Sequence, residues 1–430
     1  DTDYNYVSEL GYLIINIPEN AASDSELKCT VTQGSYTVAG DTGTTTYTFS
    51  GTEKVVPMTA SYQLTCEQAI VGMPAELTVT DADGKPISRA DIYPVSSDSS
   101  QKLGSTNMRG VFTHTFDTAG EYTFYAKKAG SGRSWNQRVI VCERTTENDG
   151  KPFGILTNGV VAPGTKSITW LTQIDGSAAA AQVRYSTTED LSNANTVDGT
   201  SALQTFVQST RGDALRSNKV TLTDLTPGTT YYYQVGDGKT WSDTQSFKTS
   251  AADAEATNFF ILGDIQTGDT ANLAAALKKL REGSYDFGVQ TGDAIDNVTM
   301  YETHCRPFLN AVNSGTLGGV DLIHVLGNHE YYGDADGKIS KAIYDLPESA
   351  QNSWYKMEYG KVCVVVVNHG TKLSETLADI AENLTTDCVW KVLVSHEPIY
   401  GTESVSATPA ILASIEKAGF SFVFGGDDHA

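Results

Sequence analysis

The first 250 residues alternate short apolar runs with polar turns, which is the pattern of half-buried β-strands. Residues 63–145 are the clearest case, with the runs AELTVTDADGKPI, GVFTHTF and GEYTFYAKK. Residues 146–250 repeat the pattern in SITWLTQ, AQVRYST, KVTLTDL and TYYYQVGD. Residues 1–62 contain fewer such runs, GYLIINI and TYTF among them. The pattern predicts two β-sandwiches that follow a small β domain over 1–62.

The pattern changes at about Asn258, where apolar strands begin to alternate with helical stretches. Six runs predict strands: NFFIL, DFGVQ, VDLIHVL, KVCVVVV, VWKVLV and FSFVF. A helix is predicted over 270–283, because its leucines recur on one stripe and a glycine ends it. A second helix is predicted to end at Gly419. Strands that alternate with helices imply βαβ units, so residues 251–430 are predicted to form an α/β domain with a largely parallel β core.

Composition narrows the choice of partners. The 430 residues include 30 Lys and Arg against 52 Asp and Glu, a formal net charge of −22. That charge repels nucleic-acid backbones, and no basic cluster offsets it, so no nucleic acid is expected to dock. No apolar run approaches the ~20 residues that span a membrane, so no transmembrane segment is expected. The Thr-, Ser-, Gly- and Tyr-rich β modules suggest a secreted or cell-surface protein, attached to the surface through its N-terminal modules.

The six cysteines do not define a pairing by themselves. Cys66 and Cys142 lie near the two ends of one predicted β domain, so a disulfide between them is one option. Cys363 lies in the run VCVVVV, which is typical of a buried thiol.

Six predicted strands of the second half end in residue types that bind metals. Along the chain these endings are Gly263-Asp264, Gly292-Asp293, Gly327-Asn328-His329-Glu330, Asn368-His369, His396 and Gly425-Gly426-Asp427-Asp428-His429. A single Gly-Asp after a strand is usually a helix cap. Ligands of open α/β sheets bind at the carboxyl ends of the strands. Six such endings in one domain therefore predict a shared site.

The donor types at these strand ends suit a pair of metal ions. Carboxylates, an amide oxygen and imidazoles are ligands of Fe, Zn or Mn, and one carboxylate can bridge two ions about 3.5–4 Å apart. The ions would bring the positive charge that a phosphate substrate needs in an acidic protein. A metal-bridging hydroxide would attack phosphorus, and a nearby histidine would protonate the leaving oxygen.

The order of these motifs resembles the calcineurin-like metallophosphoesterase superfamily. The segments GNHE and SHEPIYG and the upstream TPGTTYYYQVGD are similar to its purple acid phosphatase branch. The resemblance spans about Lys151 to Ala430. It implies a fibronectin III-like purple acid phosphatase N-terminal domain over 146–250 and a metallophosphoesterase domain over 251–430. In the former, LTPGTTYYYQV resembles the region where a tyrosine hydroxyl ties a strand to an upstream turn. Residues 63–145 resemble bacterial Ig-like modules.

The resemblance also implies roles for individual residues. The implied metal ligands are Asp264, Asp293 (the bridging carboxylate), Asn328, His396, Asp427 and His429. His329 would contact the phosphate or donate a proton, and Glu330 would be its neighbour in the surrounding shell. These two are the candidate catalytic residues.

Three further polar residues are candidates for supporting contacts around the metals: Asp296, Gln266 and His369. A backbone cap at Gln266 and a simple turn at His369 are the alternatives. His304 is predicted to be a structural residue on a helix, and His324 a core histidine with its hydrogen bonds satisfied.

Departures from the family pattern bear on these roles. Asp296 stands where purple acid phosphatases have the tyrosine that gives Fe(III) its colour, so no such colour is expected. Asp427 replaces the first histidine of the final GHxH motif, which would favour harder ions such as Mn. The stretch after His396 lacks the further histidines of family phosphatases, which weakens the case for a phosphomonoesterase. The family domain continues beyond its last motif, so Ala430 implies a truncated or trimmed C-terminus.

Two functions are compatible with these observations. The first is a secreted phosphoesterase with two metal ions, a phosphomonoesterase being favoured, that acts on a phosphorylated small molecule or protein. The second is a cell-surface binding or adhesion protein with a degenerate phosphatase domain, which the altered ligand motif and the added β modules support. The retained ligand residues favour the enzyme.

Overall fold

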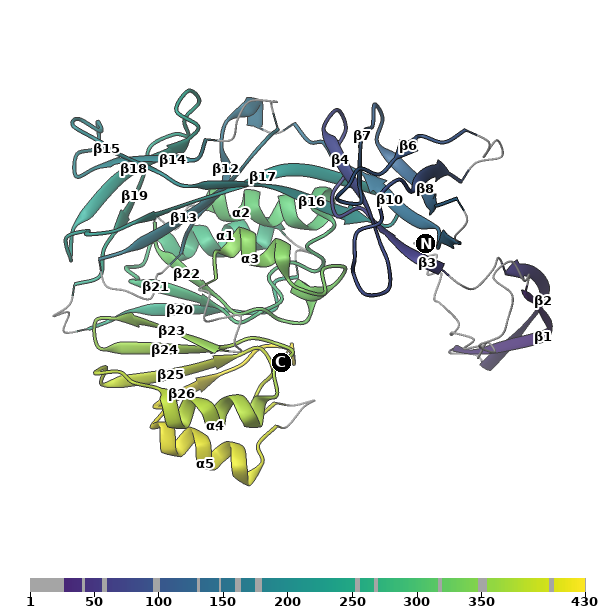
Figure 1. Cartoon of the computed structure of the whole chain (residues 1–430). Coiled ribbons are helices and arrows are strands. Elements are labelled where there is room, and N and C mark those ends of the chain that lie inside the picture. Colours follow the sequence, from purple (N-terminus) through teal and green to yellow (C-terminus); the bar gives the residue numbers. More distant parts are fainter. Residues whose placement is uncertain are drawn as a thin grey trace. The chain divides into compact units, whose positions relative to one another are not determined.

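The computed structural model describes residues 27–40, 43–55, 60–95, 101–129, 132–146, 148–158, 164–174, 180–251, 256–266, 270–315, 319–346, 354–401 and 406–429. The chain divides into two compact units (Figure 1). One comprises residues 70–72, 117–120 and 140–430, and the other comprises the remaining N-terminal residues.

The N-terminal unit is built from strands. β1 (Leu27–Gly40) and β2 (Gly43–Val55) form an antiparallel pair, and residues 1–26 of the small β domain predicted there lie outside the described residues. A second sheet has the order β6-β5-β8-β9-β3-β4-β7, with β10 paired to β8. Its strands are β3 (Ala60–Thr65), β4 (Pro74–Thr80), β5 (Asp91–Pro94), β6 (Gly104–Ser105), β7 (Val111–Thr115), β8 (Gly120–Lys127), β9 (Arg133–Ser134) and β10 (Gln137–Val141).

The strands show alternating burial, since Ala75 and Leu77 of β4 are buried while Glu76 between them is exposed. In the described part of the chain Cys66 and Cys142 are free thiols, so the disulfide considered between them is not made. Cys363 is a buried thiol, as its sequence context indicates.

Residues 143–248 of the second unit form two sheets around a shared core. One sheet has the order β11-β17-β13-β12, with β16 paired to β17, and the other has the order β15-β14-β18-β19. The strands are β11 (Glu143–Arg144), β12 (Phe153–Asn158), β13 (Lys166–Thr172), β14 (Gln182–Ser186), β15 (Asn195–Asp198), β16 (Thr200–Gln208), β17 (Arg211–Leu222), β18 (Thr230–Gly236) and β19 (Gln245–Lys248). Trp170, Val183 and Tyr233 are among the buried residues that join the two sheets. The hydroxyl of Tyr231 accepts a hydrogen bond of 2.9 Å from the Thr226 amide and ties β18 to the preceding turn.

The last part of the chain forms two sheets whose strands are largely parallel, as the sequence predicts. Their division into two sheets is not visible in the sequence. Parallel strands β20, β21 and β22 form the first, and the second has the order β23-β24-β25-β26. In the second sheet β23 is antiparallel to β24, and the other pairs are parallel. The strands are β20 (Phe259–Leu262), β21 (Phe287–Gln290), β22 (Asp321–His324), β23 (Trp354–Tyr359), β24 (Val362–Val367), β25 (Trp390–Ser395) and β26 (Phe422–Phe424).

The run VCVVVV of β24 is apolar throughout because both faces of the strand are covered. Val362, Val364 and Val366 pack in one cluster with residues of β21 and β22. Cys363 and Val365 pack on the other face with residues of α4 and α5. Two stacked sheets thus share one core, which strand periodicity alone does not reveal.

Helices cover both sheets. The helices are α1 (Thr270–Arg281), α2 (Arg306–Gly315), α3 (Lys338–Tyr344), α4 (Leu373–Asn383) and α5 (Pro409–Ala418). The two predicted helices correspond to α1, which buries Leu273 and Leu277, and to α5, which ends at Gly419 in the left-handed conformation. Three short turns are η1 (Asn148–Gly150), η2 (Tyr301–Cys305, a π-helix) and η3 (His329–Tyr331). Figure 1 shows α4 and α5 on the face of the second sheet that points away from β20–β22. In the described part of the chain no helix combines the length and apolar character of a membrane span.

The β-sandwich and the α/β part share buried contacts. Helices α1–α3 contribute to a cluster that also contains Phe153, Phe206 and Leu215 of the sandwich. The buried ammonium of Lys166 in β13 donates to the buried carboxylate of Asp321 at the start of β22. These contacts hold the strand whose loop carries Asn328.

Candidate metal centre

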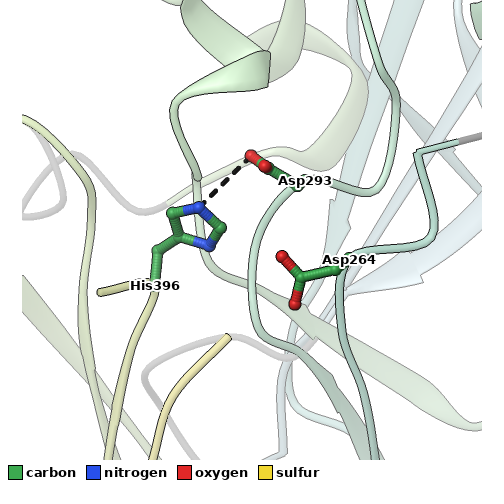
Figure 2. A group of neighbouring side chains, drawn as sticks. All are labelled: Asp264, Asp293 and His396. Atoms are coloured by element: carbon green, nitrogen blue, oxygen red, sulfur yellow. Dashed lines mark ion pairs between the residues drawn. The ribbon is translucent and has the colours of Figure 1, made fainter. Parts of the chain in front are cut away.

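The loops that follow β20, β21 and β25 bring Asp264, Asp293 and His396 together (Figure 2). One ligand atom of each side chain lies within 4.8 Å of those of the other two. The three strands belong to two stacked sheets, and their carboxyl ends meet at one edge of the domain. This is the convergence that the strand endings predict.

His396 is the central imidazole of the cluster. Its side chain is fully buried, and Nδ1 donates to the carbonyl oxygen of Thr291 at 3.0 Å. That bond fixes the ring so that Nε2 faces the other donors. Nε2 lies 2.9 Å from Oδ1 of Asn328, 3.4 Å from Oδ1 of Asp293 and 3.5 Å from Oδ1 of Asp427. Four of the six predicted ligands therefore surround one point.

Asp264 lies on the other side of the cluster with His429. Nε2 of His429 is 3.7 Å from Oδ1 of Asp264, and the same oxygen accepts a hydrogen bond of 2.9 Å from the Asp427 amide. The side chain of His429 is 53% exposed, so this side of the cluster is the more open one.

The ionisation of the side chains in the cluster favours a bound cation. Burial raises the pKa of Asp264, so its ionised form is disfavoured without a positive partner. Burial would also raise the pKa of Asp293, but the nearby His396 and His329 outweigh that effect and lower it. Burial would lower the pKa of His396, yet the hydrogen bond and charge of Asp293 raise it to about 9. In the metal-free protein a proton on His396 thus balances negative charge of the neighbouring carboxylates. A hard or borderline cation would fit at the same place.

The backbone of the site is strained. Five residues with side chains adopt left-handed conformations: Asp264 (φ 47°), Gln266 (φ 42°), Asp293 (φ 55°), Asp427 (φ 70°) and His429 (φ 51°). Such conformations cost roughly 1–3 kcal/mol each and cluster at functional sites. The strain is an independent sign that this edge of the domain is a site.

Two positions beside the ligands require glycine, because ligand side chains approach the backbone there too closely for a Cβ atom. A Cβ atom on Gly292 would lie 2.3 Å from Nδ1 of His396, and one on Gly327 would lie 2.1 Å from Oδ1 of Asp293. Any other residue at either position would therefore push a ligand side chain aside.

Glu330 is fully buried and holds the backbone of two ligand loops. Its carboxylate accepts hydrogen bonds of 2.8 Å from the amides of Asp293, Ala294 and Gly327. The amide of Ile295 donates to it at 3.3 Å. Glu330 thereby joins the loop after β21 to the loop after β22, which is a positioning role for this candidate catalytic residue.

His329 lies at the edge of the cluster. Its Nδ1 is 2.8 Å from both the carbonyl oxygen and the carboxylate Oδ1 of Asp296, so this nitrogen carries a proton. Its Nε2 points the other way, 3.6 Å from Oδ2 of Asp293 and 3.1 Å from Nε2 of Gln266. Gln266 also donates to Oδ2 of Asp293 at 3.2 Å. Asp296 thus contacts Nδ1 of His329, and Gln266 contacts both Nε2 of His329 and Asp293.

Two other neighbours complete the surroundings. His369 pairs with Glu397, and its ring centroid is 6.3 Å from that of His396. The hydroxyl of Tyr332 accepts a hydrogen bond of 3.1 Å from Nδ2 of Asn328, which turns the amide oxygen toward His396. Neither Glu397 nor the orienting role of Tyr332 is visible in the sequence, since both depend on where side chains meet.

His324 is a core residue, as predicted, but its hydrogen bonds are not satisfied. Its ring stacks on Tyr344 with the centroids 3.8 Å apart. Within the described residues neither ring nitrogen has a hydrogen-bond partner. Burial accordingly lowers its pKa to about 3, and it belongs to the packing rather than to the site.

An open pocket adjoins Asp264 and His429. Pro398, Tyr400 and Asp428 contribute to its lining, and no Lys or Arg is present among its described lining residues. A phosphate bound here would rely on metal ions for positive charge.

Two protein-family models match consecutive parts of the chain. The purple acid phosphatase N-terminal domain matches residues 154–249. The calcineurin-like phosphoesterase model matches residues 257–430. Together they cover the sandwich and the α/β part that carries the cluster.

The chain is also similar to individual phosphatases. Acid phosphatase type 7 from Danio rerio is 26% identical over 153 residues, which is 34% of this chain and 33% of the relative. The match thus spans about one third of that curated relative. A purple acid phosphatase from yellow lupin (Lupinus luteus) seeds shares the fold, with a TM-score of 0.52 at 14% identity over 85% of this chain and 80% of the lupin chain. The chain belongs to the calcineurin-like metallophosphoesterase superfamily, in its purple acid phosphatase-like branch.

Proposed function

We propose that this chain is a metal-dependent phosphoesterase that hydrolyses phosphate esters, phosphomonoesters being the favoured substrates. The observation that carries the proposal is the convergence of Asp264, Asp293 and His396 at one edge of the domain. The membership of residues 154–430 in a phosphatase family supports it. A small phosphorylated molecule or a phosphorylated protein would be the substrate.

We assign the cluster to two metal ions. Asp293 would be shared, with His396, Asn328 and Asp427 as the remaining ligands of one ion. Asp264 and His429 would hold the other. When bound, the ions would supply Lewis-acid chemistry, by neutralising phosphate charge and lowering the pKa of water. Fe, Zn and Mn suit these donors, and a carboxylate at Asp427 favours the harder Mn.

The protein itself would position the substrate and manage one proton. With Nδ1 held by Asp296, His329 presents Nε2 beside Asp293. A proton on this nitrogen would pass to the leaving oxygen as its bond to phosphorus breaks. Glu330 would keep the two ligand loops in register through their backbone amides.

We propose the domain division 1–62, 63–145, 146–250 and 251–430, with a secreted or cell-surface location. The tie between Tyr231 and Thr226 supports a fibronectin III-like second sandwich. A binding or adhesion protein with a degenerate phosphatase domain is the less favoured alternative, because the ligand side chains remain assembled.

Metal content is the first test. After dialysis against trace Mn, Zn and Fe, elemental analysis should find close to two ions per chain. Phosphomonoesters and phosphodiesters are then compared as substrates. Asp293→Asn should lose at least one ion and reduce turnover to background, because it removes the shared carboxylate. A folded wild-type protein without metal would contradict the proposal, and so would an active Asp293→Asn variant.

A further inference from the structure

We propose that Cys363 and Cys388 are an oxidisable thiol pair, which forms a disulfide between β24 and the segment that precedes β25. Both cysteines are free thiols in the structure. The inference goes beyond the proposed phosphoesterase function and does not depend on it, because neither cysteine belongs to the metal centre.

The parallel pairing of β24 with β25 brings the two cysteines to the same end of the second sheet. Val362 lies opposite Trp390, and the Trp390 amide donates to the carbonyl oxygen of Lys361 at 3.0 Å. Cys388 comes just before this pair, and its Sγ lies 3.9 Å from the carbonyl oxygen of Gly360. Both cysteines therefore flank the point at which the two strands begin.

The side chains of both cysteines also lie on the same face of the sheet, the one that packs against α4 and α5. Cys363 belongs to the buried cluster on this face, and Cys388 packs against that cluster. The hydroxyl of Thr386 interacts with both thiols, and it accepts a hydrogen bond of 3.1 Å from the Cys388 amide. Two sulfur atoms that interact with a single oxygen are near neighbours, which is the first requirement for a disulfide.

The surroundings of the pair suit a disulfide better than a metal ion. Burial raises the pKa of the Cys363 thiol to about 11, and it also raises the pKa of the Cys388 thiol. Both thiols are therefore protonated at neutral pH, whereas a metal ion needs thiolates. Among the described residues, no group of three potential ligand side chains includes either cysteine. A disulfide carries no charge, so burial does not oppose it.

The exposure of the two thiols sets the order of the reaction with a small-molecule disulfide such as glutathione disulfide. Cys388 is partly exposed, whereas Cys363 is fully buried. The thiolate of Cys388 attacks one sulfur of glutathione disulfide and releases one glutathione, which leaves a mixed disulfide on the protein. The thiolate of Cys363 then attacks Sγ of Cys388 and releases the second glutathione. Two protein thiols are oxidised, one glutathione disulfide is reduced, and the two protons pass to the released glutathione thiolates.

The bond would close a loop that contains α4 and so restrict the unfolded chain. A cross-link of this kind stabilises the folded state mainly because it lowers the entropy of the unfolded state. Oxidation of the folded, metal-free protein should therefore raise its melting temperature by about 5 °C.

Peptide mapping of the full chain tests the pair directly. The folded protein is treated with glutathione disulfide at about pH 8.5, where more of each thiol is ionised. The remaining thiols are then alkylated in denaturant, and the protein is digested with trypsin. Residues 362–372 and 373–391, which carry the two cysteines, should be recovered as one cross-linked species that separates on reduction. Cys388→Ser changes a partly exposed side chain, so this variant should fold, but it should lose both the cross-link and the rise in melting temperature.

Cys66→Ser is the matched control. Cys66 is also a partly exposed free thiol whose pKa is raised by burial, so its removal should leave the cross-link and the rise in melting temperature unchanged. Two alkylated peptides after oxidation of the wild type would overturn the proposal, and so would a cross-link from either peptide to another cysteine. The same rise in melting temperature in Cys388→Ser would also overturn it. None of these readouts uses turnover or metal, so a failure of the proposed phosphoesterase function would leave them unaffected.

Discussion

Three ligands of the candidate metal centre are oriented by neighbours that are not ligands themselves. The Thr291 carbonyl orients His396, the Tyr332 hydroxyl orients Asn328, and the Glu330 carboxylate holds the amide of Asp293. The ligands themselves are recognisable from residue type, because few side chains bind hard or borderline metals. Their supports are ordinary residues whose roles arise only where side chains meet.

The titration of His396 leads to a prediction on metal binding. Its pKa of about 9 exceeds the ordinary value, so the proton on His396 stabilises the metal-free fold fully below about pH 6.5, and that stability is lost as the pH rises through about 9. A metal ion must displace this proton at pH 7. We expect about one proton released from His396 per chain, and an affinity for Mn²⁺ that rises about tenfold per pH unit up to about pH 9.

Calorimetric titration with Mn²⁺ in two buffers of different ionisation enthalpy measures this release. The contribution of His396 should vanish as the pH passes about 9, which provides the control within one experiment. Binding without any proton release at pH 7 would show that His396 is neutral in the metal-free protein.

At the scale of secondary-structure elements, contacts at the start of a strand position the ligand that follows its carboxyl end. The carboxyl end of β22 leads to Asn328, while Asp321 at its start accepts from the buried Lys166 of β13. The hydroxyl of Tyr359 in β23 donates to the other oxygen of Asp321 at 3.0 Å. One strand is thereby fixed by the sandwich and by the second sheet.

Removal of Lys166 should therefore destabilise the fold. Lys166→Met leaves the buried carboxylate of Asp321 without its cation, which typically costs about 3–5 kcal/mol. Denaturant unfolding of the metal-free protein should show this loss. Lys151→Met, which removes an exposed partner of Asp243, is the control and should change stability by less than about 1 kcal/mol. Similar losses in both variants would argue against a special role for the buried pair.

At the scale of the whole molecule, the sandwich over 143–248 is part of the core that supports the site. Helices α1–α3 share a buried cluster with Phe153, Leu156 and Phe206. Both family models lie within the compact unit that contains this cluster. The sandwich is thus more than a spacer between the site and the N-terminal modules.

This shared core predicts cooperative unfolding of residues 140–430. Calorimetry of that fragment should show a single transition, and addition of Mn²⁺ should raise its midpoint because the metal binds only the folded state. A fragment of residues 251–430 should be far less stable, since it would expose the apolar surface that the sandwich covers. Two separate transitions in the longer fragment would show that the sandwich and the α/β part fold independently.

The succession of strands along the chain and the residues at their ends could be predicted from the sequence, because strand periodicity and metal chemistry depend on local residue types. Strands β20–β22 and β24–β26, helices α1 and α5 and the converging ligand residues follow from such patterns. The remaining helices and β23 lack a comparably clear signal. A run such as VCVVVV is apolar whenever both faces of its strand are covered, so it does not reveal how many sheets are present.

Long-range contacts determine how these parts combine. They divide the α/β strands into two stacked sheets, place Glu330 under the backbone of two loops, and pack Cys388 against the buried cluster that contains Cys363. Each of these depends on residues that are far apart in the chain. Residue types along the chain specify which chemistry the site can hold, whereas long-range packing specifies which side chains orient the ligands.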